Sequence, residues 1–159
     1  MSNENKTRLV ILISGRGSNM RSIIEAIDAQ QIDATVSAVI SNRPDAAGLD
    51  YAKAQSITTA VVDQKTFSDR DSFDKALAER IDDYKPDFVI LAGFMRILTP
   101  NLVQKYVGKM LNIHPSLLPK YQGLNTHQRA IDAKDDVHGV SVHFVTEELD
   151  GGPVILQAQ

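Results

Sequence analysis

The segment RLVILISGRGSN, residues 8–19, decides the fold of this chain. Arg8 to Ser14 is a short apolar run of the kind that forms a strand buried on both faces of a sheet. Gly15 to Asn19 is a glycine-containing loop, and apolar residues then recur at helical spacing at Met20, Ile23, Ile24 and Ile27. A buried strand, a glycine loop and an amphipathic helix in this order indicate the start of an α/β fold.

The same alternation continues along the chain. Apolar and β-branched runs predict further strands over residues 34–41, 58–62, 87–92, 110–114, 139–145 and 154–157. Helical patterns predict helices over residues 46–55, 73–81 and 126–133, and Thr99-Pro100 is typical of an N-cap before a short helix. Residues 63–71 have the composition of a polar connection. Strands that alternate with helices predict a mainly parallel sheet with helices on both faces.

Composition narrows the class of protein. The chain of 159 residues fits one domain, and its 43% apolar and 23% charged residues are ordinary for a soluble globular protein. A net charge of -3 argues against a nucleic-acid-binding surface. Because there is no cysteine, disulfides, a thiolate nucleophile and Cys-ligated zinc are excluded. We see no metal-ligand spacing, no apolar run long enough for a membrane helix and no signal peptide, so we expect a metal-free cytoplasmic protein.

The glycine loop is a candidate anion site. Backbone N–H groups and the dipole at a helix N-terminus attract anions, and Gly15 and Gly17 let the backbone approach a ligand closely. The loop lacks the lysine of a P-loop, and Met20 stands where a dinucleotide fingerprint has its third glycine. Ser18 and Asn19 add side-chain donors and helix caps. The loop therefore favours a single phosphate monoester, with a plain strand-to-helix turn as the alternative.

A second polar site follows the strand at residues 110–114, in the segment LNIHPSLLPK of residues 111–120. Asn112 and His114 point to the same side of this strand, at the carboxyl end where open α/β sheets bind ligands. The segment TEELDGGP, residues 146–153, offers a carboxylate that could orient the histidine. An amide, an imidazole and a carboxylate suit acyl-type transfer to an amine. The alternatives are a locally bonded asparagine, a structural histidine and an aspartate in a turn.

Four segments together carry a family resemblance: SGRGSN at residues 14–19, GFMRIL at 93–98, NIHPSLLPKYQG at 112–123 and HFVTEELDGGPVILQ at 143–157. In this order and spacing they resemble the phosphoribosylglycinamide formyltransferases (GAR transformylases) of the folate-dependent formyltransferase family. The resemblance runs from about Arg8 to the last residue. It implies a Rossmann-like fold and a one-carbon transfer in de novo purine biosynthesis, with 10-formyltetrahydrofolate as co-substrate.

The resemblance also assigns site residues. It implies that the catalytic residues are Asn112, His114 and Asp150. It implies that the residues that bind the substrate phosphate are Gly17, Ser18 and Asn19. Its folate-binding residues are Arg70, Met95, Arg96, Ile97, Leu98, Asn112, Glu147, Glu148, Leu149 and Asp150. The partners implied are the small molecules glycinamide ribonucleotide and 10-formyltetrahydrofolate, with no nucleic acid and no membrane, and a homodimer is left open.

The implied mechanism begins when the substrate amine attacks the formyl carbon. Asn112 donates to the oxyanion of the tetrahedral intermediate, and protonated His114 stabilises it and moves the proton to the leaving nitrogen. Asp150 accepts a hydrogen bond from His114 and raises the pKa of the imidazole. His127, His138 and His143 are assigned no catalytic role.

The chain departs from the family pattern at three places. Gln122 and Asn125 stand where the family often has proline and histidine, which affects loop rigidity more than chemistry. Family members usually continue for several tens of residues past the position of Gln159. We therefore expect residues 1–159 to be a single formyltransferase domain that is truncated at its C-terminus and has little or no activity as it stands.

Two other functions remain open, and a third, methionyl-tRNA formyltransferase, is disfavoured. A formyltetrahydrofolate deformylase would transfer the formyl group to water, but usually carries an N-terminal regulatory domain. A methionyl-tRNA formyltransferase would need an RNA-binding domain and a basic surface. A truncated, non-catalytic module would bind folate or phosphate without turnover.

Overall fold

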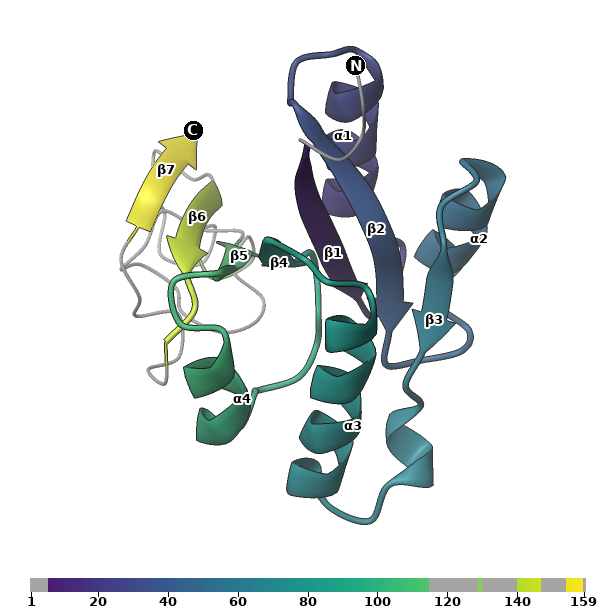
Figure 1. The fold of residues 1–159 in the computed structure, drawn as a ribbon, viewed down its shortest axis with the longest axis vertical. Helices are drawn as coiled ribbons and strands as arrows, with labels where there is room; N and C mark the ends of the chain where they lie inside the picture. Colours follow the sequence, from purple (N-terminus) through teal and green to yellow (C-terminus); the bar gives the residue numbers. More distant parts are fainter. Residues whose placement is uncertain (1–5, 115–128, 130–139, 147–153, 159) are drawn as a thin grey trace.

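A seven-stranded mixed sheet forms the centre of the described part of the chain (Figure 1). The computed structural model describes residues 6–114, 129, 140–146 and 154–158. The strands are β1 (Thr7–Ile13), β2 (Ala34–Ser41), β3 (Thr59–Val61), β4 (Phe88–Leu91), β5 (Met110–His114), β6 (Val140–Phe144) and β7 (Val154–Ala158). The helices are α1 (Ser18–Asp28), α2 (Ala47–Ala54), the short 3₁₀ helix η2 (Gln64–Thr66), α3 (Arg70–Asp83) and α4 (Pro100–Lys105).

The sheet order is β3-β2-β1-β4-β5-β6-β7. All neighbours from β3 to β5 are parallel, whereas β5 with β6 and β6 with β7 are antiparallel. The arrowheads of β2 and β3 in Figure 1 point to the same end of the sheet. The predicted mainly parallel α/β sheet is therefore confirmed, and the loops after the parallel strands meet at one edge, which we call the carboxyl edge.

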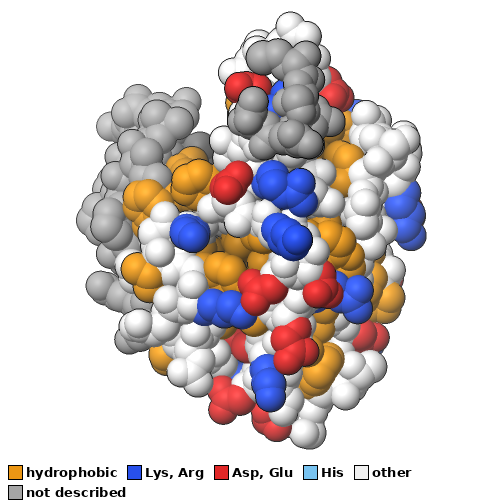
Figure 2. Space-filling model, viewed as in Figure 1, with side chains coloured by type: hydrophobic (Ala, Val, Ile, Leu, Met, Phe, Trp, Pro, Cys, Tyr) orange, Lys and Arg blue, Asp and Glu red, His pale blue; other side chains and the backbone are white. Residues whose placement is uncertain are grey.

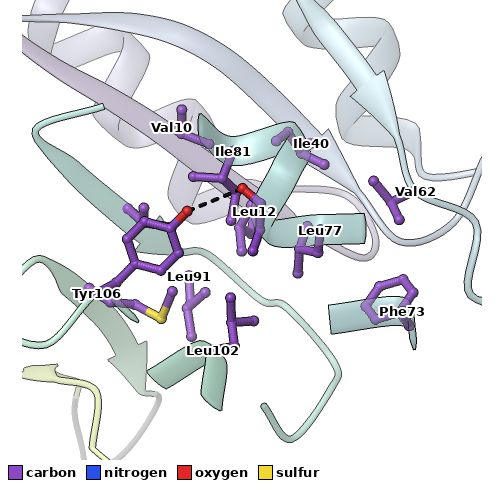
Figure 3. Packing of buried hydrophobic residues seen from close by; sticks show 13 residues of the cluster. Val10, Leu12, Ile40, Val62, Phe73, Leu77, Ile81, Leu91, Leu102 and Tyr106 are labelled. Atoms are coloured by element: carbon purple, nitrogen blue, oxygen red, sulfur yellow. Dashed lines mark hydrogen bonds between the residues drawn. The ribbon is translucent and has the colours of Figure 1, made fainter. Parts of the chain in front are cut away.

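The core lies on both faces of the sheet because β1 is buried on both. Val10 and Leu12 belong to the cluster packed against α3 and α4, and Ile11 and Ile13 belong to the cluster packed against α1 and α2. Figure 3 shows the first cluster, with Phe73, Leu77 and Ile81 of α3 turned toward it. The expected helical stripes thus face the sheet from its two sides, as Rossmann-like folds require.

The region expected to be a polar connection, residues 63–71, contains the short helix η2 and the start of α3. Asp63 caps η2, and Asp69 caps α3 by accepting the backbone N–H of Ser72 at 2.7 Å. At the start of α4, Thr99 accepts the N–H of Leu102, as the N-cap pattern predicts. The predicted helix over residues 126–133 falls, apart from Arg129, outside the described residues.

The visible surface carries charges of both signs. Figure 2 shows Lys and Arg interspersed with Asp and Glu over the face that α3 presents, so this face has no basic patch. None of the helices within the described ranges is both long and apolar enough to cross a membrane.

Candidate functional site

Polar residues that lie in or after four strands are found at the carboxyl edge. Ser14 follows β1, Asn42 follows β2, Gln64 lies in η2 just after β3, and Asn112 lies in β5. Residues 93–99, which lie between β4 and α4, contact Ser14 and Gln64 and are called here the β4 segment. This is the edge at which the sequence predicted the site.

The glycine loop enters α1 through a left-handed residue. Gly17 stands at the N-cap with φ 69° and ψ 40°, and no side chain caps this helix. Ser18 and Asn19 are its first residues, so the expectation that they cap it is wrong. The uncapped N–H groups of the first turn and the helix dipole suit an anion.

The loop is held from the side by α2. The Gly48 N–H donates to the Gly15 carbonyl oxygen at 2.9 Å. A Cβ on Gly48 would lie 2.6 Å from Ile13 Cδ1, 3.0 Å from the Arg16 carbonyl oxygen and 3.1 Å from that of Gly15. A glycine in the first turn of α2 therefore allows close packing under the loop.

The backbone of the β4 segment is anchored at alternate residues. The Met95 N–H donates to Ser14 Oγ at 2.7 Å, and the Thr99 N–H donates to the buried Asp74 Oδ2 at 2.7 Å. Between them, Arg70 Nη2 donates to the Ile97 carbonyl oxygen at 2.6 Å.

Because of these anchors, two apolar side chains of the β4 segment face solvent. Met95 is 59% exposed and Ile97 is 63% exposed, which is unusual for residues so firmly held. Leu98 differs, because its side chain is partly buried against the core cluster. An apolar surface on a fixed backbone is a common way to bind a flat ring.

Arg96 is engaged within the protein. Its Nη1 donates to Gln64 Oε1 at 3.0 Å, and its guanidinium carbon lies 4.1 Å from the centre of the Phe73 ring. Its Nε is buried and has no hydrogen-bond partner among the described residues. The Arg96 side chain therefore links the β4 segment to η2 and α3.

Asn112 is paired with a histidine that the sequence analysis left unassigned. Asn112 and His143 are register partners across β5 and β6, with Asn112 Nδ2 lying 3.2 Å from His143 Nε2. His143 Nδ1 lies 3.0 Å from the Phe144 carbonyl oxygen, and the side chain is 2% exposed. A carbonyl only accepts, so in the tautomer whose Nδ1–H donates to Phe144, Nε2 accepts the Asn112 amide N–H.

Several predicted residues lie wholly or partly outside the described part of the chain. His114 lies on the same face of β5 as Asn112 by backbone alternation, and its side chain is outside the description. Glu147 to Asp150, Gln122 and Asn125 also fall outside the described residues. Among the residues that are described, no group of three or more His, Asp or Glu is arranged to hold a metal ion.

Comparisons with known proteins agree with this architecture. A family model described as formyl transferase matches residues 7–159. The chain is 55% identical over 151 residues to the phosphoribosylglycinamide formyltransferase of Escherichia coli strain K12, covering 95% of this chain and 71% of that protein.

Solved structures show the same similarity. The phosphoribosylglycinamide formyltransferase of Coxiella burnetii, in complex with CHES, superposes with a TM-score of 0.90 at 47% identity, covering 98% of this chain and 74% of that one. The glycinamide ribonucleotide transformylase 1 of Symbiobacterium toebii gives 0.93 at 40% identity, covering 96% and 72%. The chain therefore belongs to the formyl transferase family, in which it is similar to proteins named phosphoribosylglycinamide formyltransferase.

Proposed function

We propose that this protein transfers the formyl group of 10-formyltetrahydrofolate to the amine of glycinamide ribonucleotide, in de novo purine biosynthesis. The observation that carries the proposal is the meeting of three features at the carboxyl edge of a formyl transferase sheet. These are an uncapped glycine-loop helix, a fixed apolar segment and Asn112 between β4 and β6.

The two substrates have chemically different requirements, which match two parts of the edge. The phosphate of the nucleotide suits Gly17, Ser18 and Asn19, where backbone N–H groups and the dipole of α1 favour an anion. The ring of the folate suits the exposed Met95 and Ile97. Arg70, exposed at the start of α3, adds a positive charge beside Ile97 for a folate carboxylate.

The reaction requires a hydrogen-bond donor that stabilises the oxyanion and a group that carries a proton. The amine nitrogen bonds to the formyl carbon, and the carbonyl oxygen becomes an oxyanion that accepts the Asn112 amide N–H. Protonated His114 gives its proton to N10 of the folate as the bond between formyl carbon and N10 breaks, and the proton lost by the attacking amine restores the imidazolium. Asp150 holds His114 in its protonated form.

The Asn112 side chain suits the role of oxyanion hydrogen-bond donor because its orientation is fixed by a neighbouring side chain. The contact with the His143 ring fixes the orientation of the amide, so its N–H groups need not reorganise during the reaction. An asparagine restrained only by its own rotamer would lose part of this advantage.

The decisive experiment follows a labelled formyl group. Protein in excess is mixed with 10-[¹³C]formyltetrahydrofolate and glycinamide ribonucleotide, and the products are read by NMR under single-turnover conditions. We expect the label in the formamide of formylglycinamide ribonucleotide. Label in free formate, at the same rate with or without the nucleotide, would instead identify a deformylase.

Controls separate binding from chemistry. Glycinamide without its ribose phosphate should react far more slowly, because the site at Gly17 to Asn19 contributes no binding energy to it. If neither compound is formylated while folate still binds, the chain is a folate-binding module. A cytoplasmic location and a homodimer remain predictions.

A further inference from the structure

A closed ring of hydrogen bonds lies at the carboxyl edge, next to the β4 segment. Ser14 Oγ donates to Asn42 Oδ1 at 2.6 Å, and Asn42 Nδ2 donates to Gln64 Oε1 at 2.9 Å. Arg96 Nη1 donates to the same Gln64 oxygen at 3.0 Å. The neighbouring Met95 N–H returns to Ser14 Oγ at 2.7 Å and closes the ring.

The ring restrains the β4 segment at two successive residues by different means. It holds Met95 by its backbone and Arg96 by its side chain. The Phe73 ring, packed against the Arg96 guanidinium, limits the remaining freedom of that side chain. The two restraints together fix how the segment leaves β4, and hence where Met95 projects.

The hydrogen bonds of the ring are costly to break because two of its side chains are buried away from water. Ser14 is 4% exposed and Asn42 is 2% exposed, so a broken bond there leaves a buried polar group unpaired. Gln64 is the member whose side-chain oxygen accepts two of the four bonds. Gln64 is also only half-buried, so it can be substituted without disturbing the hydrophobic core.

We propose that Gln64 is a positioning residue for the formyl donor. Through Arg96 and Asn42 it holds the β4 segment in the shape that presents Met95 and Ile97 to the folate ring. This inference rests on the proposed function, since it concerns the affinity of the same folate site. Gln64 acts through its neighbours, so its loss should alter donor binding and leave the chemical step unchanged.

Three variants test the role of the oxygen. Gln64→Met keeps the length of the side chain and removes both accepted bonds, whereas Gln64→Glu keeps an acceptor oxygen at the same position. Gln55→Met is the matched control, because Gln55 is exposed at the C-terminal end of α2, away from the ring. Thermal melts establish that each variant is folded before any comparison is made.

The first measurement needs no ligand. Amide hydrogen exchange at Met95 should be at least about tenfold faster in Gln64→Met than in the original protein, because the ring is open. Gln64→Glu and Gln55→Met should stay within about twofold of the original rate. Equal exchange rates in all four proteins would show that Gln64 does not hold the segment.

The second measurement separates affinity from rate. Calorimetry with tetrahydrofolate should give a dissociation constant about tenfold higher for Gln64→Met, a change of about 1.4 kcal/mol, and a nearly unchanged value for Gln64→Glu. The single-turnover rate at saturating 10-formyltetrahydrofolate should change by less than about threefold in both. Unchanged affinity in Gln64→Met, equal loss in Gln64→Glu, or a loss confined to the saturated rate would each overturn the proposal.

The variant Ser14→Ala tests whether Gln64 and Ser14 act through the same ring of hydrogen bonds. Combined with Gln64→Met, it should weaken tetrahydrofolate binding by less than the product of the two single effects, because either change alone opens the same ring. Independent effects would mean that no ring operates. If the original protein binds no tetrahydrofolate, the proposed function fails, and the exchange experiment alone decides whether Gln64 holds the segment.

Discussion

Replacing Gly48 by alanine should reveal whether α2 supports the glycine loop. Alanine is favoured over glycine inside a helix by about 1 kcal/mol, so an isolated α2 would gain stability. The structure opposes this gain, because the new methyl group would lie 2.6 Å from Ile13 Cδ1 and 3.0 Å from the Arg16 carbonyl oxygen.

The size of the effect follows from these distances. Carbon atoms pack at about 3.5–4.0 Å, so the Ile13 methyl must retreat by about 1 Å within a fully buried environment. Overpacking of this kind costs about 1–3 kcal/mol, which leaves a net loss of about 0–2 kcal/mol after the helical gain. In a chain of this size each kcal/mol lowers Tm by about 2–4 °C.

The loop should move as well as the core. The carbonyl groups of Gly15 and Arg16 are pushed away from α2, and the bond from the Gly48 N–H to Gly15 lengthens. We expect nucleotide affinity to fall about tenfold, or about 1.4 kcal/mol, with folate affinity little changed. Urea unfolding and calorimetry with both ligands measure the two effects.

The control is Gly15→Ala, used for stability alone. A Cβ there meets nothing within 4 Å of the described structure, so its stability should stay within about 0.5 kcal/mol of the original. If Gly48→Ala is instead about 1 kcal/mol more stable and binds the nucleotide normally, the loop does not depend on α2.

Three further outcomes are expected. Tyr106→Phe should cost about 1 kcal/mol in urea unfolding, because it removes the hydrogen bond that the Tyr106 hydroxyl donates to Asp82 at 2.7 Å. Burial and Asp82 raise the pKa of this hydroxyl, whose single proton is shared with the more distant Ala78 carbonyl oxygen at 3.3 Å (dashed line in Figure 3). The hydrogen bonds from Ser72 lower the pKa of Asp69 below 3.8, so its contribution is present above about pH 4 and is lost as the pH falls through the lowered value. The stability gap between the original protein and Asp69→Ala should therefore shrink as the pH falls below 3.8, and a constant gap in urea titrations would contradict this. Gly17→Val should destabilise the chain by about 1–2 kcal/mol because of its φ of 69°, and calorimetry should show nucleotide binding weakened more than folate binding.

Sequence patterns predicted the helices and strands well where an element is determined by interactions between residues close in the sequence. The β-branched run of residues 34–41 and the run at 110–114 became β2 and β5 with the expected bounds, since strand ends there coincide with turn residues. Thr99 caps α4 for the same reason: capping depends on residues three apart. The order of strands in the sheet needed the further assumption that parallel strands are joined through helices.

The support of the site could not be predicted in the same way. Ser14, Asn42 and Gln64 each have the sequence signature of an ordinary turn residue, and only the sheet order brings them into one ring. His143 alternates with apolar neighbours, which indicates its face but not its partner. Its contact with Asn112 depends on the antiparallel register of β5 and β6, which no local pattern encodes.

Asp74 illustrates the limit of helical periodicity. A carboxylate in the second turn of α3 is expected to face water, yet Asp74 is buried and accepts the Thr99 N–H. The tertiary hydrogen bond to Oδ2 outweighs the usual preference of aspartate for solvent, although Oδ1 is buried without a hydrogen-bond partner among the described residues.

The measurement that tests the account most directly is the single-turnover rate of formyl transfer to glycinamide ribonucleotide in His114→Ala. The account predicts a fall of at least about 100-fold with tetrahydrofolate affinity nearly unchanged, as expected when a proton carrier and charge stabiliser is removed beside Asn112. A rate close to that of the original protein, with the variant folded and binding folate normally, would show that the chemistry does not take place at this strand end.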